Sequence, residues 1–160
     1  MRELYNESEK ILETLRSRSQ TLATAESLSG GLLGATLTQV PGASDVYLGG
    51  VIAYDLKIKS ELLAVAPDVI MQHGVVSSAV ALAMAAGVRA RTGSDWSIST
   101  TGVAGPGPSG GVPAGRVWIA VSGPNLLNFS EELSLSGDRD QVRMATIARA
   151  LAAFTRILGE

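Results

Sequence analysis

The chain has 160 residues, of which 46% are hydrophobic and 18% are charged. This length and apolar content are enough to build a sizeable core, and we expect one domain over residues 1–160. The chain contains no cysteine and a single histidine, His73. This composition excludes disulfides, zinc–thiolate sites and a cysteine nucleophile, and we expect no bound metal. The net charge of −2 provides no field that would attract nucleic acid or an anionic membrane.

The N-terminal segment is charged, and it lacks the uninterrupted apolar region of a secretory signal. No apolar run elsewhere approaches the ~18 residues that a membrane span needs. We therefore expect a cytoplasmic protein with no membrane partner.

The first elements are predicted to be a helix, a strand and a second helix. Residues 3–17 carry apolar side chains at helical spacing, with charged side chains on the opposite face. Residues 20–25 form a short apolar run that is typical of a buried strand. A helix is then expected from about residue 30 to residue 38, and the turn residues at 40–44 end it.

The middle of the chain is predicted to hold one strand and three helices. Residues 45–54 are rich in strand formers, and the Gly49-Gly50 pair within them indicates a bulge or a close backbone approach. The helices are expected over residues 55–63, 67–73 and 78–92. Ser77 is expected to cap the last of them.

The last part of the chain is predicted to form three strands and a C-terminal helix. The strands span residues 96–101, 116–122 and 126–135, and the helix spans residues 138–157. This order of elements predicts an α/β fold, a three-layer α/β/α sandwich with a mixed central sheet.

A chemically rich turn at residues 24–31 lies between the first strand and the second helix. It contains two serines, Ser27 and Ser29, and two glycines, Gly30 and Gly31. Such a strand-to-helix turn can present a nucleophile and bind an anion. Either serine also fits an N-cap, and composition alone favours capping over catalysis. A carboxylate such as Glu26 at an apolar strand end is costly unless paired, so it stabilises the turn or meets a cation.

Other candidates each have a structural and a chemical interpretation. Lys59, taken alone, is a surface charge, but beside a serine nucleophile its burial would lower its pKa until it served as a base. Tyr54 lies five residues earlier and is placed to orient either group. Arg139, at the start of the last helix, is either a surface charge or a phosphate clamp.

A glycine-rich segment at residues 105–110 matches the spacing G-x-G-x-x-G. In a dinucleotide-binding fold this motif opens a helix, whereas here prolines intervene and a strand follows. We therefore interpret the segment as a loop.

Seven motifs across residues 5–158 resemble the CinA C-terminal domain family, the nicotinamide mononucleotide deamidases. The first motif, which is similar to the family's A-E-S-C-T-G-G, is Ala25-Glu26-Ser27-x-Ser29-Gly30-Gly31. The other matching segments, in chain order, are residues 40–44, residues 49–54 with Lys59, and residues 73–77, 101–106, 115–118 and 137–139.

The resemblance implies an enzyme that hydrolyses the carboxamide of nicotinamide mononucleotide. The products would be nicotinic acid mononucleotide and ammonia, formed in pyridine-nucleotide recycling without a cofactor. Ser27 would be the nucleophile and Lys59 the base, with Tyr54 supporting them. The implied substrate-binding residues are Glu26, Ser29, Gly30, Gly31, Thr101, Gly102 and Arg139. Thr101 would lie near the reacting amide and Arg139 would contact the phosphate.

The sequence departs from the family pattern at two places. Leu28-Ser29 stands where the family has Cys-Thr. Residues 112–115 read Val-Pro-Ala-Gly where members often have Lys-Pro-Val-Gly, and Arg116 is the nearest replacement for that cation. These departures keep two alternatives open: a catalytically degenerate nucleotide-binding module, and an interaction protein in competence or damage responses. We expect a nucleotide as the small-molecule partner. We also expect a homo-oligomer, with residues 78–92 and the first helix as candidate faces.

Overall fold

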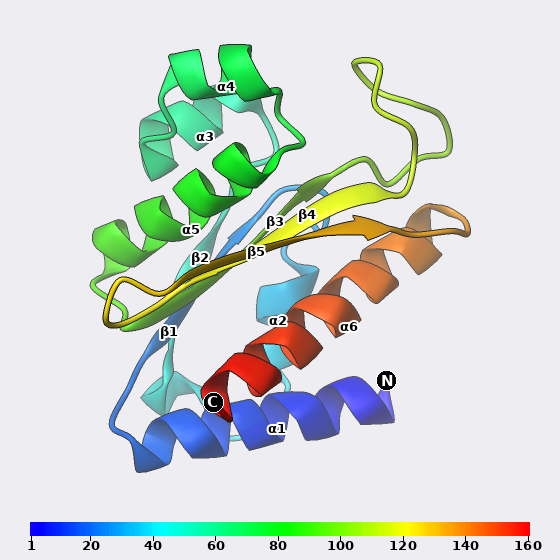
Figure 1. Cartoon of the computed structure of the whole chain (residues 1–160). Coiled ribbons are helices and arrows are strands. Elements are labelled where there is room, and N and C mark those ends of the chain that lie inside the picture. The colour runs from blue at the N-terminus through cyan, green and yellow to red at the C-terminus, as the bar shows by residue number, and fades with distance from the viewer.

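The computed structural model describes residues 1–160 and contains one five-stranded sheet in the order β2-β1-β3-β4-β5 (Figure 1). The strands are β1 (Leu22–Glu26), β2 (Tyr47–Ile52), β3 (Trp96–Gly102), β4 (Arg116–Ser122) and β5 (Asn128–Ser134). β1 pairs in parallel with both β2 and β3, whereas β3, β4 and β5 pair antiparallel. The carboxyl ends of β1, β2 and β3 therefore lie at the same edge of the sheet.

Six α-helices cover the two faces of this sheet (Figure 1). One face carries α1 (Arg2–Ser17), α2 (Leu32–Thr38) and α6 (Arg139–Leu158). The other carries α3 (Leu56–Leu63), α4 (Pro67–His73) and α5 (Ser78–Thr92). The predicted three-layer α/β/α sandwich with a mixed sheet is confirmed. None of the helices combines the length and the apolar character that a bilayer crossing requires.

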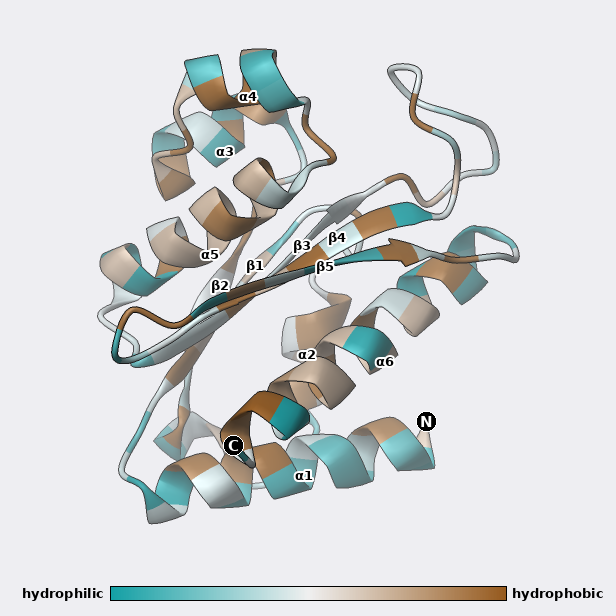
Figure 2. Cartoon of the chain, in the orientation of Figure 1, coloured by the Kyte–Doolittle hydropathy of each residue, from teal (hydrophilic) through white to brown (hydrophobic).

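Two apolar clusters hold the three layers together. The larger contains 25 buried residues and joins the sheet to α1, α2 and α6; within it the rings of Trp96 and Phe154 meet edge to face at 5.5 Å. The smaller contains 8 buried residues, among them Leu63 and Met84, and joins the sheet to α3 and α5. Figure 2 shows hydrophobic and hydrophilic residues interspersed along α1 and α6, and the hydrophobic ones that are buried belong to the larger cluster. Burial of these clusters supplies most of the driving force for folding.

Most predicted elements are present within one to three residues of their expected ends. The largest differences are the two strands expected at residues 45–54 and 126–135, which are shorter than predicted. α2 also begins at Leu32 instead of Gly30, because Gly30 and Gly31 have φ angles of +59° and +98°. A left-handed backbone cannot continue a right-handed helix, so this glycine pair remains part of the turn.

The Gly49-Gly50 pair in β2 produces both features that the sequence indicates. The register between β1 and β2 shifts so that Leu22 pairs with Tyr47 and Ala23 pairs with Gly49, which leaves Leu48 as the bulged residue. A Cβ atom on Gly50 would also collide with the Thr24 hydroxyl and lie 2.8 Å from its carbonyl oxygen.

This close approach predicts the effect of a single methyl group. Gly50→Ala is expected to lower the free energy of unfolding by about 1–3 kcal/mol, since Thr24 and its backbone must shift. The measurement is urea unfolding followed by circular dichroism. Gly107→Ala is the control, because a Cβ there meets nothing within 4 Å. Equal stability of the two variants would contradict this account of β2.

Candidate active site

The centre of the site is a hydrogen bond between two buried side chains that lie 32 residues apart in the sequence. Ser27 directly follows β1, and Lys59 lies within α3. The Lys59 Nζ donates to the Ser27 Oγ at 2.9 Å. Lys59 is only 1% exposed and Ser27 is 7% exposed. The structure thus brings together the two residues to which the resemblance assigns the nucleophile and the base.

The surroundings of Lys59 disfavour its protonated form. Its Nζ also donates to the backbone carbonyls of Ala53 at 2.6 Å and Tyr54 at 3.5 Å, and no carboxylate forms an ion pair with it. Burial lowers the pKa of Lys59 from 10.5 to about 8, while the negative charge of Asp55 acts in the opposite direction. An appreciable fraction of Lys59 is therefore neutral near neutral pH and available as a proton acceptor.

The turn that carries Ser27 is held by the carboxylate of Glu26. This side chain is 2% exposed, and its two oxygens accept hydrogen bonds from the backbone N–H groups of Leu33 at 2.9 Å and Gly34 at 3.0 Å. Negative charge at a helix N-terminus is favourable, so Glu26 caps α2. The sequence predicted that Glu26 either stabilises the turn or meets a cation. The structure shows that it stabilises the turn.

The expected serine cap on α2 is wrong. The N-cap residue is Gly31, and no side chain there accepts a capping hydrogen bond. Ser29 instead hydrogen-bonds through its Oγ to the Oγ1 of Thr100 at 2.7 Å, and it is fully buried. Glu26 performs the capping from outside the usual sequence spacing, because the left-handed glycines bring the helix start back toward the strand end.

Two successive backbone N–H groups in this turn have no acceptor within the chain. The Ser27 N–H donates to the Thr100 carbonyl and the Gly30 N–H donates to the Ser27 carbonyl, both at 3.0 Å. The N–H groups of Leu28 and Ser29, by contrast, donate to no group, although these residues are 3% and 0% exposed. Neighbouring free N–H groups form a concavity that suits an anion.

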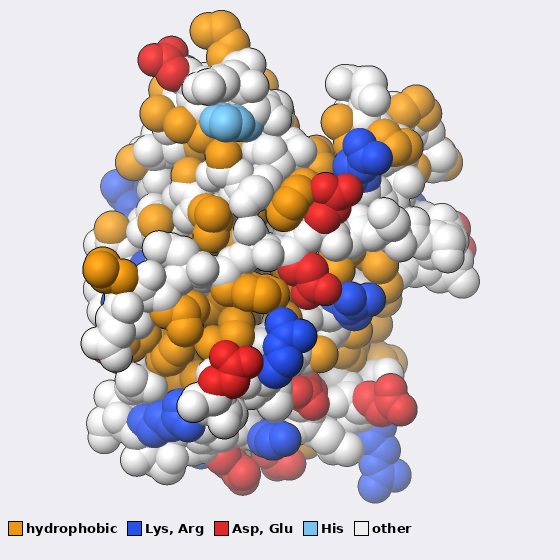
Figure 3. Space-filling view, in the orientation of Figure 1, with side chains coloured by type: hydrophobic (Ala, Val, Ile, Leu, Met, Phe, Trp, Pro, Cys, Tyr) orange, Lys and Arg blue, Asp and Glu red, His pale blue; other side chains and the backbone are white.

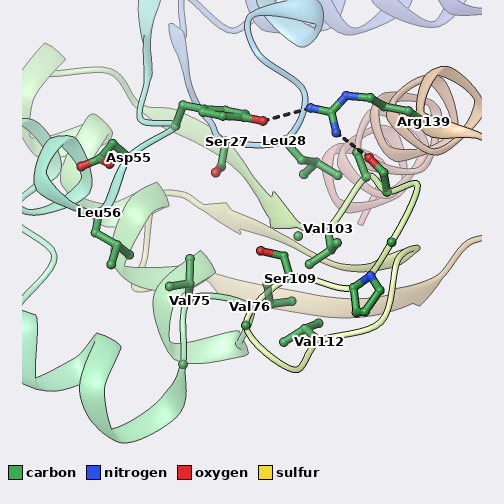
Figure 4. Close-up of a pocket in the computed structure, with 18 of the residues that line it drawn as sticks. Ser27, Leu28, Asp55, Leu56, Val75, Val76, Val103, Ser109, Val112 and Arg139 are labelled. Carbon is green, nitrogen blue, oxygen red and sulfur yellow. Dashed lines mark hydrogen bonds between the residues drawn. The ribbon is translucent and has the colours of Figure 1, made fainter.

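A cavity of 720 Å³ opens beside Ser27 (Figure 4). It lies at the carboxyl edge of the sheet. Figure 3 shows it as the hollow between α4, which carries the only histidine, and the loop at 103–112. The residues of the resemblance-based set that line this cavity are Ser27, Tyr54, Lys59, Gly102 and Arg139. Most of the remaining wall comes from residues 73–76 and from the loop at 103–112.

Five residues expected to bind substrate do not line the cavity: Glu26, Ser29, Gly30, Gly31 and Thr101. Glu26 is occupied by the N-terminus of α2, and Ser29 by Thr100. Thr101 is fully buried and donates its hydroxyl to the Val75 carbonyl at 3.0 Å. Thr101 therefore braces the segment that forms the wall instead of facing the cavity.

The cavity wall is mainly apolar and carries few charges. Its apolar side chains are Leu28, Leu56, Val75, Val76, Val103 and Val112. Its charged side chains are Asp55, Lys59 and Arg139. His73 also lines the cavity, but its imidazole makes no hydrogen bond within the chain, and the side chain that bonds to Ser27 is Lys59. No group of three or more His, Asp or Glu side chains is arranged to hold a metal ion.

Arg139 and Tyr54 both line the cavity, and Figure 4 shows the two hydrogen bonds of Arg139 as dashed lines. The Arg139 Nη2 donates to the Tyr54 hydroxyl at 2.9 Å, and its Nη1 donates to the Gly105 carbonyl at 2.6 Å. Arg139 thereby connects the start of α6 to the loop at 103–112 and to Tyr54, whose backbone carbonyl accepts from Lys59.

One residue in contact with the turn was missed by the sequence interpretation. Arg143 donates from its Nε to the Leu28 carbonyl at 3.2 Å and from its Nη2 to the Ser29 carbonyl at 3.1 Å. The signal in the sequence is its position four residues after Arg139, which places both arginines on one face of α6.

Comparison with known proteins identifies the family of this chain. The model of the CinA C-terminal domain matches residues 5–158. The chain belongs to the CinA C-terminal domain family. A CinA-like protein of Myxococcus xanthus is 46% identical over 144 residues, which are 88% of this chain and 34% of that protein. One from a Synechococcus species is 49% identical over 145 residues, again 88% of this chain and 34% of the relative. The chain thus spans about a third of the length of these curated relatives.

Solved structures of the family have the same fold. The competence damage-inducible protein A (ComA) of Klebsiella pneumoniae superposes with a TM-score of 0.94 at 30% identity, covering 98% of both chains. The competence/damage inducible protein CihA of Agrobacterium tumefaciens superposes with a TM-score of 0.93 at 30% identity, covering 98% of this chain and 96% of that one.

The cap on α2 leads to a prediction about stability. Glu26→Ala is expected to lower the free energy of unfolding by about 2–3 kcal/mol, because the buried N–H of Leu33 and the partly buried N–H of Gly34 lose a charged acceptor. Urea unfolding measures this loss. Glu61→Ala is the control: its exposed ion pair with Lys57 contributes less than about 1 kcal/mol. Similar losses in both variants would contradict the capping role.

The lowered pKa of Lys59 leads to a second prediction. Below pH 8 Lys59 is protonated in the folded chain, and burying this charge lowers the free energy of unfolding. Between pH 8 and 10.5 the unfolded chain binds more protons than the folded one, so the free energy of unfolding rises with pH. Lys59→Met removes the titrating group. The stability of Lys59→Met relative to the natural chain is therefore expected to be higher at about pH 7 than at about pH 10, by about 2–3 kcal/mol.

Chemical denaturation of both proteins at the two pH values makes this measurement, and all other titrating groups cancel in the difference. A difference between the two proteins that stays constant with pH would show that Lys59 keeps an ordinary pKa in the folded state.

Proposed function

We propose that this domain is an amidohydrolase that converts nicotinamide mononucleotide to nicotinic acid mononucleotide and ammonia. The observation that carries the proposal is the 2.9 Å hydrogen bond between the buried Lys59 and Ser27 at the wall of a cavity. A serine nucleophile needs an adjacent base, and a lysine serves as that base when burial lowers its pKa. The choice of substrate and the role in pyridine-nucleotide recycling rest on the family resemblance.

In the first half of the reaction, the Ser27 Oγ attacks the carboxamide carbon while neutral Lys59 takes the hydroxyl proton. The negative charge that develops on the carboxamide oxygen is stabilised by the free N–H groups of Leu28 and Ser29. When the intermediate collapses, the C–N bond breaks, and protonated Lys59 gives its proton to the departing ammonia. The enzyme is left as an acyl ester on Ser27.

In the second half, a water molecule attacks the ester and gives a proton to Lys59. The C–O bond to Ser27 breaks, and the Ser27 oxygen takes the proton back from Lys59. The carboxylic acid product releases its remaining proton to solvent and leaves as the carboxylate, and Ser27 and Lys59 return to their starting states. This sequence uses no metal ion and no redox cofactor.

The cavity provides a surface for each part of this substrate. The apolar side chains of Leu28, Val75 and Val103 offer contact for a flat pyridine ring. Arg139 provides the cation for a phosphate, and Tyr54 holds its guanidinium at 2.9 Å. Binding of the phosphate would exchange a contact of Arg139 with the chain for a stronger, charge-assisted one.

Removal of either central side chain is expected to abolish activity. Ser27→Ala and Lys59→Ala should each lower the rate of ammonia release at least about 1,000-fold while the fold survives, because one lacks the nucleophile and the other lacks its base. The measurement is an ammonia assay with purified protein and nicotinamide mononucleotide. Lys57→Ala is the matched control, since Lys57 lies on α3 but is exposed and pairs with Glu61. Full activity in Ser27→Ala or Lys59→Ala would overturn the mechanism.

The rate of this reaction should depend on pH through Lys59. Only the neutral amine accepts the Ser27 proton, so kcat/KM is expected to rise with pH and level off above about pH 8, the pKa of Lys59. A pH profile of kcat/KM tests this directly. A rate that falls as pH rises between about 6 and 9 would exclude the neutral amine as the base.

The second candidate function is a nucleotide-binding module without turnover. Leu28, which stands where the family has Cys, lines the cavity next to the nucleophile, and this departure motivates the alternative. A pure binder would show thermal stabilisation by nicotinamide mononucleotide with no release of ammonia. The same purified protein thus decides between the two functions. The third alternative is a role in competence or damage responses, which the names of the solved relatives mention. In this alternative the chain would act through a protein partner.

A further inference from the structure

Arg143 contacts the turn on the side opposite Lys59. It projects from α6, and its guanidinium donates two hydrogen bonds to successive carbonyl oxygens, those of Leu28 and Ser29, at 3.2 and 3.1 Å. Its side chain is 30% exposed, and its only ion pair is a 3.7 Å contact with the exposed Asp140. This arginine therefore directs two of its donors at the backbone immediately after Ser27.

The planarity of the peptide bond links these carbonyls to the free N–H groups. In a trans peptide the C=O and the N–H point in opposite directions. The carbonyl of Leu28 shares its peptide unit with the N–H of Ser29. Because Arg143 holds that carbonyl toward α6, the Ser29 N–H points away from α6, and α3 with Lys59 packs against the opposite face of the sheet.

The charge of Arg143 also strengthens this N–H as a donor. A cation at the carbonyl oxygen withdraws electron density from the peptide unit, and hydrogen bonds in a chain polarise one another in a low-dielectric environment. Leu28 and Ser29 are both buried, so water screens this effect weakly. The orientation and the charge act on the same N–H, that of Ser29, which has no acceptor within the chain.

We propose that Arg143 is a positioning residue that aims and polarises the Leu28–Ser29 peptide, so that its N–H stabilises the oxyanion formed when Ser27 is acylated. This inference rests on the proposed nucleophile, Ser27, but not on the identity of the amide substrate. Arg143 touches no substrate atom in this scheme, and it is not among the residues that line the cavity. A purely structural brace would hold the turn but leave the reactivity of Ser27 unchanged once the protein is folded.

The test uses a probe that does not depend on the substrate. A fluorophosphonate phosphonylates an activated serine by forming an O–P bond and expelling fluoride, and the transition state places negative charge on the phosphoryl oxygen. The rate of labelling at Ser27 is measured from about pH 6 to about pH 9.5. The variants are Arg143→Met, which keeps much of the length without the charge, and Arg143→Lys, which keeps the charge with one donor group. Arg149→Met is the matched control, since Arg149 lies on the same helix and pairs with Glu131.

Arg143→Met is expected to slow labelling about 10- to 100-fold at every pH, with the midpoint of the pH profile unchanged, because the oxyanion contact weakens while Lys59 is untouched. Arg143→Lys should fall between Arg143→Met and the natural chain, and Arg149→Met should label at the natural rate. With nicotinamide mononucleotide as substrate, Arg143→Met should lower kcat and leave KM unchanged.

Three results would overturn the inference: labelling of Arg143→Met at the natural rate, a slower rate that arises only from a shifted midpoint, or equal losses in Arg143→Met and Arg149→Met. If Arg143→Met does not fold, Arg143→Lys decides, and its labelling at the natural rate would overturn the inference. Absence of labelling at Ser27 in the natural chain would overturn both this inference and the proposed mechanism. If the variants show the expected labelling rates but the natural chain releases no ammonia from nicotinamide mononucleotide, the role of Arg143 would stand. Only the proposed substrate would then be wrong.

Discussion

The hydrogen bond between Lys59 and Ser27 is the interaction on which the rest of the site depends. Burying a lysine costs free energy, and here only backbone carbonyls and one hydroxyl compensate for it. A carboxylate in direct contact would hold the amine protonated and remove its value as a base. Asp55, the acidic residue whose charge acts on Lys59, instead turns its side chain to the N–H of Lys57 and caps α3. The site thus keeps the lysine close to its serine and without a counter-ion.

The sheet topology explains why these residues meet at one place. The chain leaves β1 toward α2 on one face of the sheet, and it leaves β2 toward α3 on the other face. Neighbouring parallel strands whose connections run to opposite faces leave a crevice at their carboxyl ends, and ligands of open α/β sheets bind there. Ser27 follows β1, and Tyr54 and Lys59 follow β2, so the two sides of the crevice each supply part of the site.

Much of the fold follows from the sequence because it is encoded locally. Apolar periodicity and turn residues place nearly every helix and strand, and the Gly49-Gly50 pair indicates the irregularity in β2. The pairing of Ser27 with Lys59 is not local, and it was predicted only through the family motifs. The roles of Glu26 and Ser29 depend on the left-handed glycines that follow them, which redirect the chain so that a carboxylate at the strand end reaches the helix start. The usual spacing rules for helix caps do not predict this contact.

The two buried charged residues of the turn show how one site combines stability with reactivity. Glu26 accepts from two backbone N–H groups and so stabilises the start of α2. Lys59 donates to backbone carbonyls, but burial outweighs these contacts and lowers its pKa. Both oxygens of Glu26 are engaged by α2, and no ion pair joins this carboxylate to Lys59. The two buried charged groups of the site thus have separate partners: the start of α2 satisfies the carboxylate, whereas Ser27 and two backbone carbonyls accept from the amine.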